Sequence, residues 1–183
     1  YFRHVSLGGW PFSTADHGWP IADCTAEGLK VALLMNRPLL GSLSKPLSPD
    51  RFEQAVNVLL TLQSFDGAWG TYEQQRMGHW VELLNPAELY DDIMVDYSWV
   101  ELTSASIQAL LAFHEQFPNH RAAEIFAAVR TGLNFLRRRQ LPDGSWRGGW
   151  ASCFSSATWF GVEALVRASE VGGARLVGQA DEA

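Results

Sequence analysis

The chain carries the segment Gln63-Ser64-Phe65-Asp66-Gly67-Ala68-Trp69 and uses the same pattern again in Gln140-Leu141-Pro142-Asp143-Gly144-Ser145-Trp146. Both segments read Q-x3-G-x-W. Each follows a helical stretch, makes a turn at Asp-Gly, where Gly tolerates a positive φ, and returns a large indole to the preceding structure. Gln, Gly and Trp supply no acid, base or nucleophile, so we interpret these residues as scaffold. Helix pairs joined in this way predict a ring or solenoid of helices.

Helical periodicity continues outward from both segments, and no sustained apolar/polar alternation typical of strands is found. The fold class expected is therefore all-α. Gly9-Trp10 is interpreted as the end of a third copy of the motif. Helices are expected over residues 25–35, from Ser48-Pro49 onward, after Asn85-Pro86, and over residues 101–116, 121–139 and 156–170.

Composition limits the classes of protein to consider. The 183 residues are 47% hydrophobic, which fits one domain or part of a larger one, and no apolar run is long enough to span a membrane. A net charge of -6 argues against nucleic acid as a partner. With Cys24 and Cys153 as its cysteines, the chain has no disulfide framework, and reduced thiols in an intracellular setting are expected. Because the chain starts at Tyr1 without Met, we interpret it as an internal piece of a longer protein.

Common catalytic signatures are missing from the sequence, including G-x-S-x-G, the P-loop, G-x-G-x-x-G and H-E-x-x-H. The histidines do not pair at ligand spacing, so no metal site is expected. An acidic run contains Glu88, Asp91, Asp92 and Asp96, and a helix there would place Asp92 and Asp96 on one face, able to hold Mg²⁺. Its D-D-x-x-x-D spacing favours a solvated acidic face or local capping instead.

The pentapeptide Asp23-Cys24-Thr25-Ala26-Glu27 opens a helix in a region rich in aromatic residues. Asp23 and Glu27 are four residues apart, so one carboxyl can deliver a proton while the other helps to resupply it. Cys24 can offer its S–H to the first carboxyl. The alternative is an ordinary Asp N-cap. A helix N-terminus favours the carboxylate by about 0.3–1 kcal/mol, so an uncharged Asp23 requires burial or hydrogen bonding strong enough to outweigh that preference.

Three features together resemble the oxidosqualene cyclases: this pentapeptide, the two Q-x3-G-x-W segments and the run Gly8-Gly9-Trp10-Pro11-Phe12-Ser13-Thr14. The likeness covers nearly the whole chain. It implies that residues 1–170 are part of a catalytic α/α barrel of inner and outer helices. Residues 171–183 are expected to be a divergent tail, and loose order is expected from Ser169 onward.

The resemblance also implies roles for single residues. Asp23 would protonate the epoxide of 2,3-oxidosqualene, Cys24 and Cys153 would hydrogen-bond its carboxyl, and Glu27 would belong to the reprotonation route. Phe12 and Tyr72 would stabilise the migrating cation through their ring faces, each by about 0.5–2 kcal/mol. The implied reaction uses no metal and no redox cofactor.

His17 and Ile21 bear on the product, because the run Asp16-His17-Gly18-Trp19-Pro20-Ile21 resembles members of the family that form cycloartenol. The alternatives are lanosterol or another triterpene as product, and a non-catalytic helical-repeat module or an inactive fragment. The chain departs from the family where Ser156 replaces an aromatic residue, which is expected to alter the cavity. The full-length enzyme is expected to be monotopic, on the cytoplasmic side of the endoplasmic reticulum membrane or on lipid droplets.

Overall fold

The computed structural model describes residues 5–37, 45–89, 92–149, 153–173 and 176, and all of its regular structure is helical. Its elements are η1 (Ala15–His17), α1 (Ala22–Met35), α2 (Pro49–Leu62), η2 (His79–Leu84), α3 (Val100–Gln116), α4 (Ala122–Arg139) and α5 (Cys153–Gly172). Among the described residues β pairing is limited to isolated bridges. The all-α prediction is confirmed.

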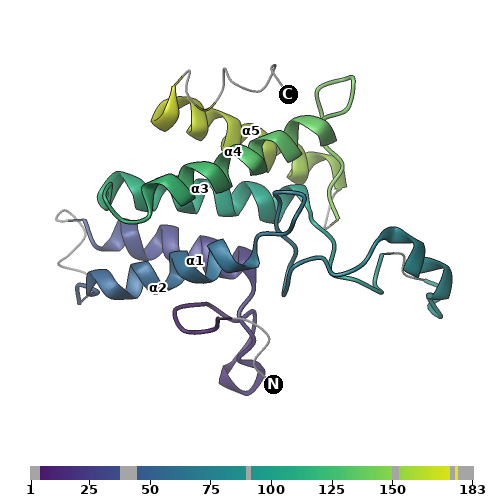
Figure 1. The fold of residues 1–183 in the computed structure, drawn as a ribbon, viewed down its shortest axis with the longest axis horizontal. Helices are drawn as coiled ribbons and strands as arrows, with labels where there is room; N and C mark the ends of the chain where they lie inside the picture. Colours follow the sequence, from purple (N-terminus) through teal and green to yellow (C-terminus); the bar gives the residue numbers. More distant parts are fainter. Residues whose placement is uncertain (1–4, 38–44, 90–91, 150–152, 174–175, 177–183) are drawn as a thin grey trace.

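Helix α3 lies at the centre of the molecule (Figure 1). It packs most extensively against α1 on one side and α5 on the other, while α2 and α4 cover these helices from outside. Every residue from Val100 to Leu111 is buried, as expected of a helix enclosed on all sides. Inner helices (α1, α3, α5) therefore alternate with outer helices (α2, α4). This is the arrangement predicted for a segment of an α/α barrel.

The first Q-x3-G-x-W segment links outer helix α2 to inner helix α3. The side-chain amide of Gln63 donates to the carbonyl of Gly67 at 2.8 Å, and the indole N–H of Trp69 donates to the carbonyl of Leu59 at 2.7 Å. Gly67 has a φ of 86°, which a residue with a Cβ rarely adopts. Trp69 is completely buried. The motif therefore closes the turn and anchors it in the core.

The second segment reproduces the first one between α4 and α5. Gln140 donates to the carbonyl of Gly144 at 2.9 Å, Trp146 donates to the carbonyl of Leu136 at 2.7 Å, and Gly144 has a φ of 85°. The interpretation of this motif as scaffold is thus supported by both copies.

A threonine near the start of each inner helix completes the repeat. Its hydroxyl oxygen accepts the backbone N–H of the tryptophan at 3.0–3.1 Å in three pairs: Trp10 with Thr25, Trp69 with Thr103, and Trp146 with Thr158. The shared contact supports Gly9-Trp10 as the end of a third copy. It also fixes a common register for α1, α3 and α5.

Several predicted boundaries are wrong. Helix α1 begins at Ala22 with Ile21 as its N-cap, so Asp23 lies in the first turn and is not the cap. No helix follows Asn85-Pro86 within the described residues, because the 3-10 helix η2 ends just before it and the Asn85 side chain accepts the N–H of Ala87 in a turn. Helix α5 begins at Cys153 and continues to Gly172, past the point where loose order was expected.

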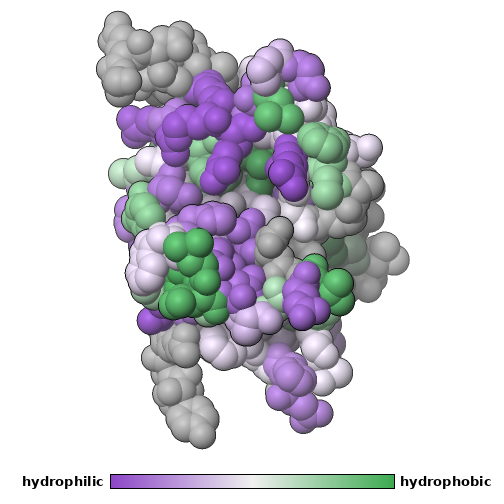
Figure 2. Space-filling model, turned by 90° about the vertical axis from the view of Figure 1, so that its right-hand side faces the viewer, coloured by the Kyte–Doolittle hydropathy of each residue, from purple (hydrophilic) through white to green (hydrophobic). Residues whose placement is uncertain are grey.

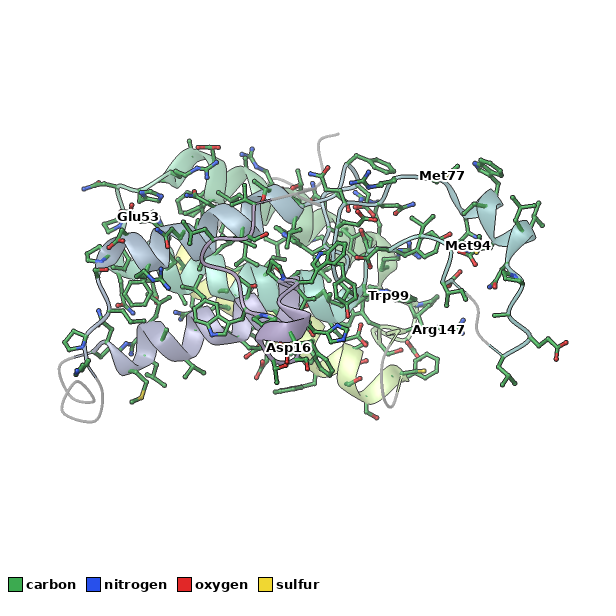
Figure 3. The ribbon with its side chains drawn as sticks, turned by 90° about the horizontal axis from the view of Figure 1, so that it is seen from below. Asp16, Glu53, Met77, Met94, Trp99 and Arg147 are labelled. Atoms are coloured by element: carbon green, nitrogen blue, oxygen red, sulfur yellow. The ribbon has the colours of Figure 1, made fainter. Side chains whose placement is uncertain are left out.

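Between the first motif and α3, residues 74–89 and 92–95 form an arm that projects away from the helices (Figure 1). Figure 3 shows Met77 and Met94 on this arm, and Trp99 and Arg147 between it and the helices. The arm exposes Leu83 by 88% and Leu89 by 87%. Seen from its end, the molecule has apolar patches among polar side chains (Figure 2).

Candidate active site

Asp23 lies in the first turn of α1, where the backbone N–H groups have no partner within the helix. Its Oδ1 accepts the backbone N–H of Cys24 at 2.8 Å. The chain before the helix is held in place as well, because Ile21 N–H donates to the carbonyl of Trp10 and Ala22 N–H donates to the carbonyl of Thr71. The first turn of α1 is therefore held by the loop that contains Trp10 and by the loop that follows the first Q-x3-G-x-W segment.

Asp23 lines a half-open cavity of about 200 Å³ between the three inner helices. We call it the acid cavity. It is lined by Asp23, Glu27, Glu101, Leu102, Ala105, Ser156 and Phe160. Acidic side chains thus share this space with apolar ones.

The lining of the acid cavity follows from the repeat. Two residues before the motif threonine, the inner helices carry Asp23, Glu101 and Ser156; two residues after it they carry Glu27, Ala105 and Phe160. Six of the seven lining residues therefore occupy equivalent positions of α1, α3 and α5. The three helices make the same threonine contact with a tryptophan, and residues at the same distance from that threonine line one cavity.

Burial raises the pKa of the Asp23 carboxyl above its usual value, although the Cys24 backbone N–H lowers it, and the nearby Glu27 charge adds to the rise. Desolvation thus outweighs the preference of a helix N-terminus for a carboxylate, as the sequence interpretation required. The result is a carboxyl that holds its proton more strongly than an exposed one.

Cys24 is half-buried, and burial followed by the charges of Asp23 and Glu27 raises the pKa of its thiol, which keeps it as S–H. The hydrogen bond that joins it to Asp23, however, comes from its backbone. Cys153 is the exposed first residue of α5, one turn before Ser156, and it is not among the lining residues. The predicted thiol contacts with Asp23 therefore stay predictions.

Three of the four predicted substrate-binding residues, Phe12, His17 and Tyr72, line a second hollow of about 430 Å³. We call it the aromatic hollow; its other lining residues are Ser13, Trp19, Glu73 and Asp96. Trp19 and Tyr72 meet edge to face at 6.1 Å between ring centroids. Phe12 is 77% exposed and Tyr72 is 43% exposed. Ile21, the fourth, is buried and lines neither the aromatic hollow nor the acid cavity, and its role stays a prediction.

The acidic run has a structural role. Asp96 accepts the backbone N–H groups of Thr71 at 2.8 Å and Glu73 at 2.9 Å, and also that of Tyr72, and so pins the base of the arm beside the aromatic hollow. Asp92 lies 2.7 Å from Nε2 of His79. Asp92 and Asp96 do not share a helix face, because Asp92 has a φ of 56° and residues 92–96 do not form a helix. The interpretation as local capping fits Asp96, and Asp91 lies outside the described residues.

Sequence reasoning missed Glu101, Leu102 and Phe160, and it noted Ser156 only as a departure from a family pattern. The tryptophan and the threonine of each pair are 15, 34 and 12 residues apart, so their spacing gives no sequence signal for these residues. Neither a group of three or more metal-ligating side chains nor a helix able to cross a membrane is found in the described part of the chain.

Comparison with known proteins gives consistent results. The family described as squalene-hopene cyclase C-terminal domain matches residues 2–181. The chain is 51% identical over 172 residues to a cycloartenol synthase of Dictyostelium discoideum, covering 93% of this chain and 24% of the relative. It is 52% identical over 165 residues to a lanosterol synthase of Mus musculus, covering 90% and 22%. An alpha-onocerin synthase of Lycopodium clavatum is 39% identical over 166 residues, covering 91% and 22%. The chain thus spans about a quarter of the length of these relatives.

Proposed function

Because the chain belongs to the squalene-hopene cyclase C-terminal domain family, we propose that it forms the acid-bearing part of an oxidosqualene cyclase that makes a sterol precursor. The observation that carries the proposal is Asp23: it lines the acid cavity between the three inner helices, and burial raises the pKa of its carboxyl. The identity of about 50% with a cycloartenol synthase and a lanosterol synthase supports the choice of substrate.

In the proposed reaction, the Asp23 carboxyl transfers its proton to the epoxide oxygen of 2,3-oxidosqualene. The C–O bond breaks, a hydroxyl forms, and the carbon left positive is attacked by the nearest alkene. Ring closure moves the positive charge along the chain until one proton is lost, and the electrons of the broken C–H bond then form either a cyclopropane C–C bond, as in cycloartenol, or a new alkene, as in lanosterol. A thiol such as Cys24 suits this site, because a neutral donor stabilises the carboxyl without removing its proton as a basic partner would.

The aromatic hollow provides the type of surface that the later cations need. Phe12, Trp19 and Tyr72 line it with aromatic rings, whose π faces stabilise positive charge without forming bonds. His17 lines the same hollow and is proposed to take part in the final proton loss. We propose cycloartenol as the product, with lanosterol as the alternative, because a mouse lanosterol synthase is 52% identical. We also propose that the whole enzyme is monotopic, since its substrate is dissolved in lipid.

The test is a chimaera in which this chain replaces the matching quarter of the Dictyostelium cycloartenol synthase. The chimaera is expected to convert 2,3-oxidosqualene to a tetracyclic sterol, identified by mass spectrometry. Asp23→Asn should lower the rate by roughly 10²–10⁴-fold, the usual contribution of a general acid. A folded chimaera that makes no cyclised product, or an Asp23→Asn variant with undiminished rate, would contradict the proposal.

A further inference from the structure

Lys30 is held between two helices beside the acid cavity. It lies one turn after Glu27 on α1, with its Nζ 2.7 Å from Oε1 of that glutamate. The same Nζ donates to Oε1 of Gln108 on α3 at 3.1 Å. A lysine has donors only, so the amide oxygen of Gln108 must face it. Because Gln108 is 9% exposed, the lysine is fixed at its tip by a side chain that is itself immobilised.

The residue that Lys30 holds connects the acid cavity with solvent. Glu27 lines the cavity, yet its side chain is 49% exposed, whereas that of Lys30 is 24% exposed. A half-exposed glutamate has several accessible rotamers, so burial alone does not fix the position of its carboxylate. The ion pair with the anchored Lys30 favours those Glu27 rotamers in which the carboxylate stays close to the lysine ammonium group.

The charges around the cavity make this contact specific. The acids in the lining are Asp23 and Glu27 on α1 and Glu101 on α3, and Lys30 brings a positive charge to this group through Glu27. The contribution of α5 is uncharged, since it consists of Ser156 and Phe160. Lys30 therefore gives the Glu27 carboxylate an opposite charge at 2.7 Å beside the acidic lining.

We propose that Lys30, anchored by Gln108, is a positioning residue that keeps the Glu27 carboxylate at the edge of the acid cavity, where it returns a proton to Asp23 between turnovers. The inference rests on the proposed function. Each cyclisation moves one proton from Asp23 to the epoxide oxygen and releases one proton from the final cation elsewhere. Asp23 is left as a carboxylate, and Glu27 collects one proton from water, passes it to Asp23 and becomes a carboxylate again.

The test compares first and later turnovers of the chimaera with Lys30→Gln. The first turnover uses the proton already on Asp23, so its rate and amplitude should match those of the unaltered chimaera. Steady-state turnover should fall about two- to fivefold, the range expected from losing a partly exposed ion pair. Lys30→Arg should restore it, and Gln108→Leu should give a smaller loss. The matched control is Lys45→Gln, which removes the same charge from an exposed loop before α2 and should change neither phase.

Two results would overturn the inference: an unchanged steady-state rate in Lys30→Gln, or an equal loss in the first and later turnovers, which would indicate a merely structural role. Gln108→Leu gives an independent reading, because it breaks the anchor while keeping the lysine. If the unaltered chimaera makes no sterol, the proposed function fails; if it is active and Lys30→Gln turns over normally, only the role of Lys30 fails.

Discussion

Replacing Leu102 by Ala should admit water to the acid cavity and so lower the pKa of Asp23. Leu102 is 1% exposed and forms part of the apolar lining beside that carboxyl. Since burial is the largest cause of the raised Asp23 pKa, opening the lining should move that pKa toward its usual value.

The cost in stability can be derived from the cavity itself. A buried Leu→Ala change costs about 2.7–5 kcal/mol, and the cost grows with the size of the dry void that remains. The acid cavity already has about 200 Å³, and the acidic side chains in its lining can hydrogen-bond to water, so water can fill the added space. We therefore expect about 2–3 kcal/mol for Leu102→Ala. The matched control Leu110→Ala, in the same helix but outside the lining, should cost about 3–5 kcal/mol, because its void stays dry.

Urea unfolding of the 183-residue chain gives the free energies, and ¹³C NMR titration of the carboxyl groups gives the pKa of Asp23. The expected result is that Leu102→Ala lowers this pKa and Leu110→Ala does not. If Leu102→Ala destabilises the chain while Asp23 titrates as before, burial by the three inner helices is not what keeps its proton.

Three further outcomes are expected from unfolding measurements. Because burial raises the folded-state pKa of Asp23, its stabilising contribution is complete below the unfolded pKa of about 3.9 and is lost as pH rises through the folded pKa. Asp23→Asn should therefore be more stable than the natural chain at pH 7 and lose that advantage near pH 3; an advantage that is the same at both pH values would contradict this sign. Trp146→Phe should cost at least about 1–3 kcal/mol by leaving a buried carbonyl without its N–H donor, whereas Trp159→Phe, at a site 57% exposed, should stay within about 0.5 kcal/mol. Gly67→Ala should destabilise more than Gly144→Ala: both have a positive φ, worth about 1–2 kcal/mol, but only at Gly67 would the new Cβ lie 2.7 Å from a threonine side chain, so equal losses would contradict the contact.

Much of the fold could be predicted from the sequence, because its signals are local. Pro49 after Ser48 starts α2 as expected, and the apolar periodicity of residues 101–116 matches α3 within one residue. Asn85-Pro86 misled the prediction, since the same residue types also make a turn. In the candidate site, Asp23 and Glu27 could be found because both belong to one pentapeptide.

The sequence by itself determined the all-α class, the turns at Gly67 and Gly144 and the acid at position 23, because periodicity, backbone freedom and a short motif act over a few residues. Only the tertiary structure decided that Glu101 and Ser156 share the cavity of Asp23. Their meeting depends on three inner helices held in one register by contacts between tryptophan backbone N–H groups and threonine hydroxyls, and such long-range packing is not encoded in any one segment. The same packing buries part of the Asp23 carboxyl, and that burial is what raises its pKa.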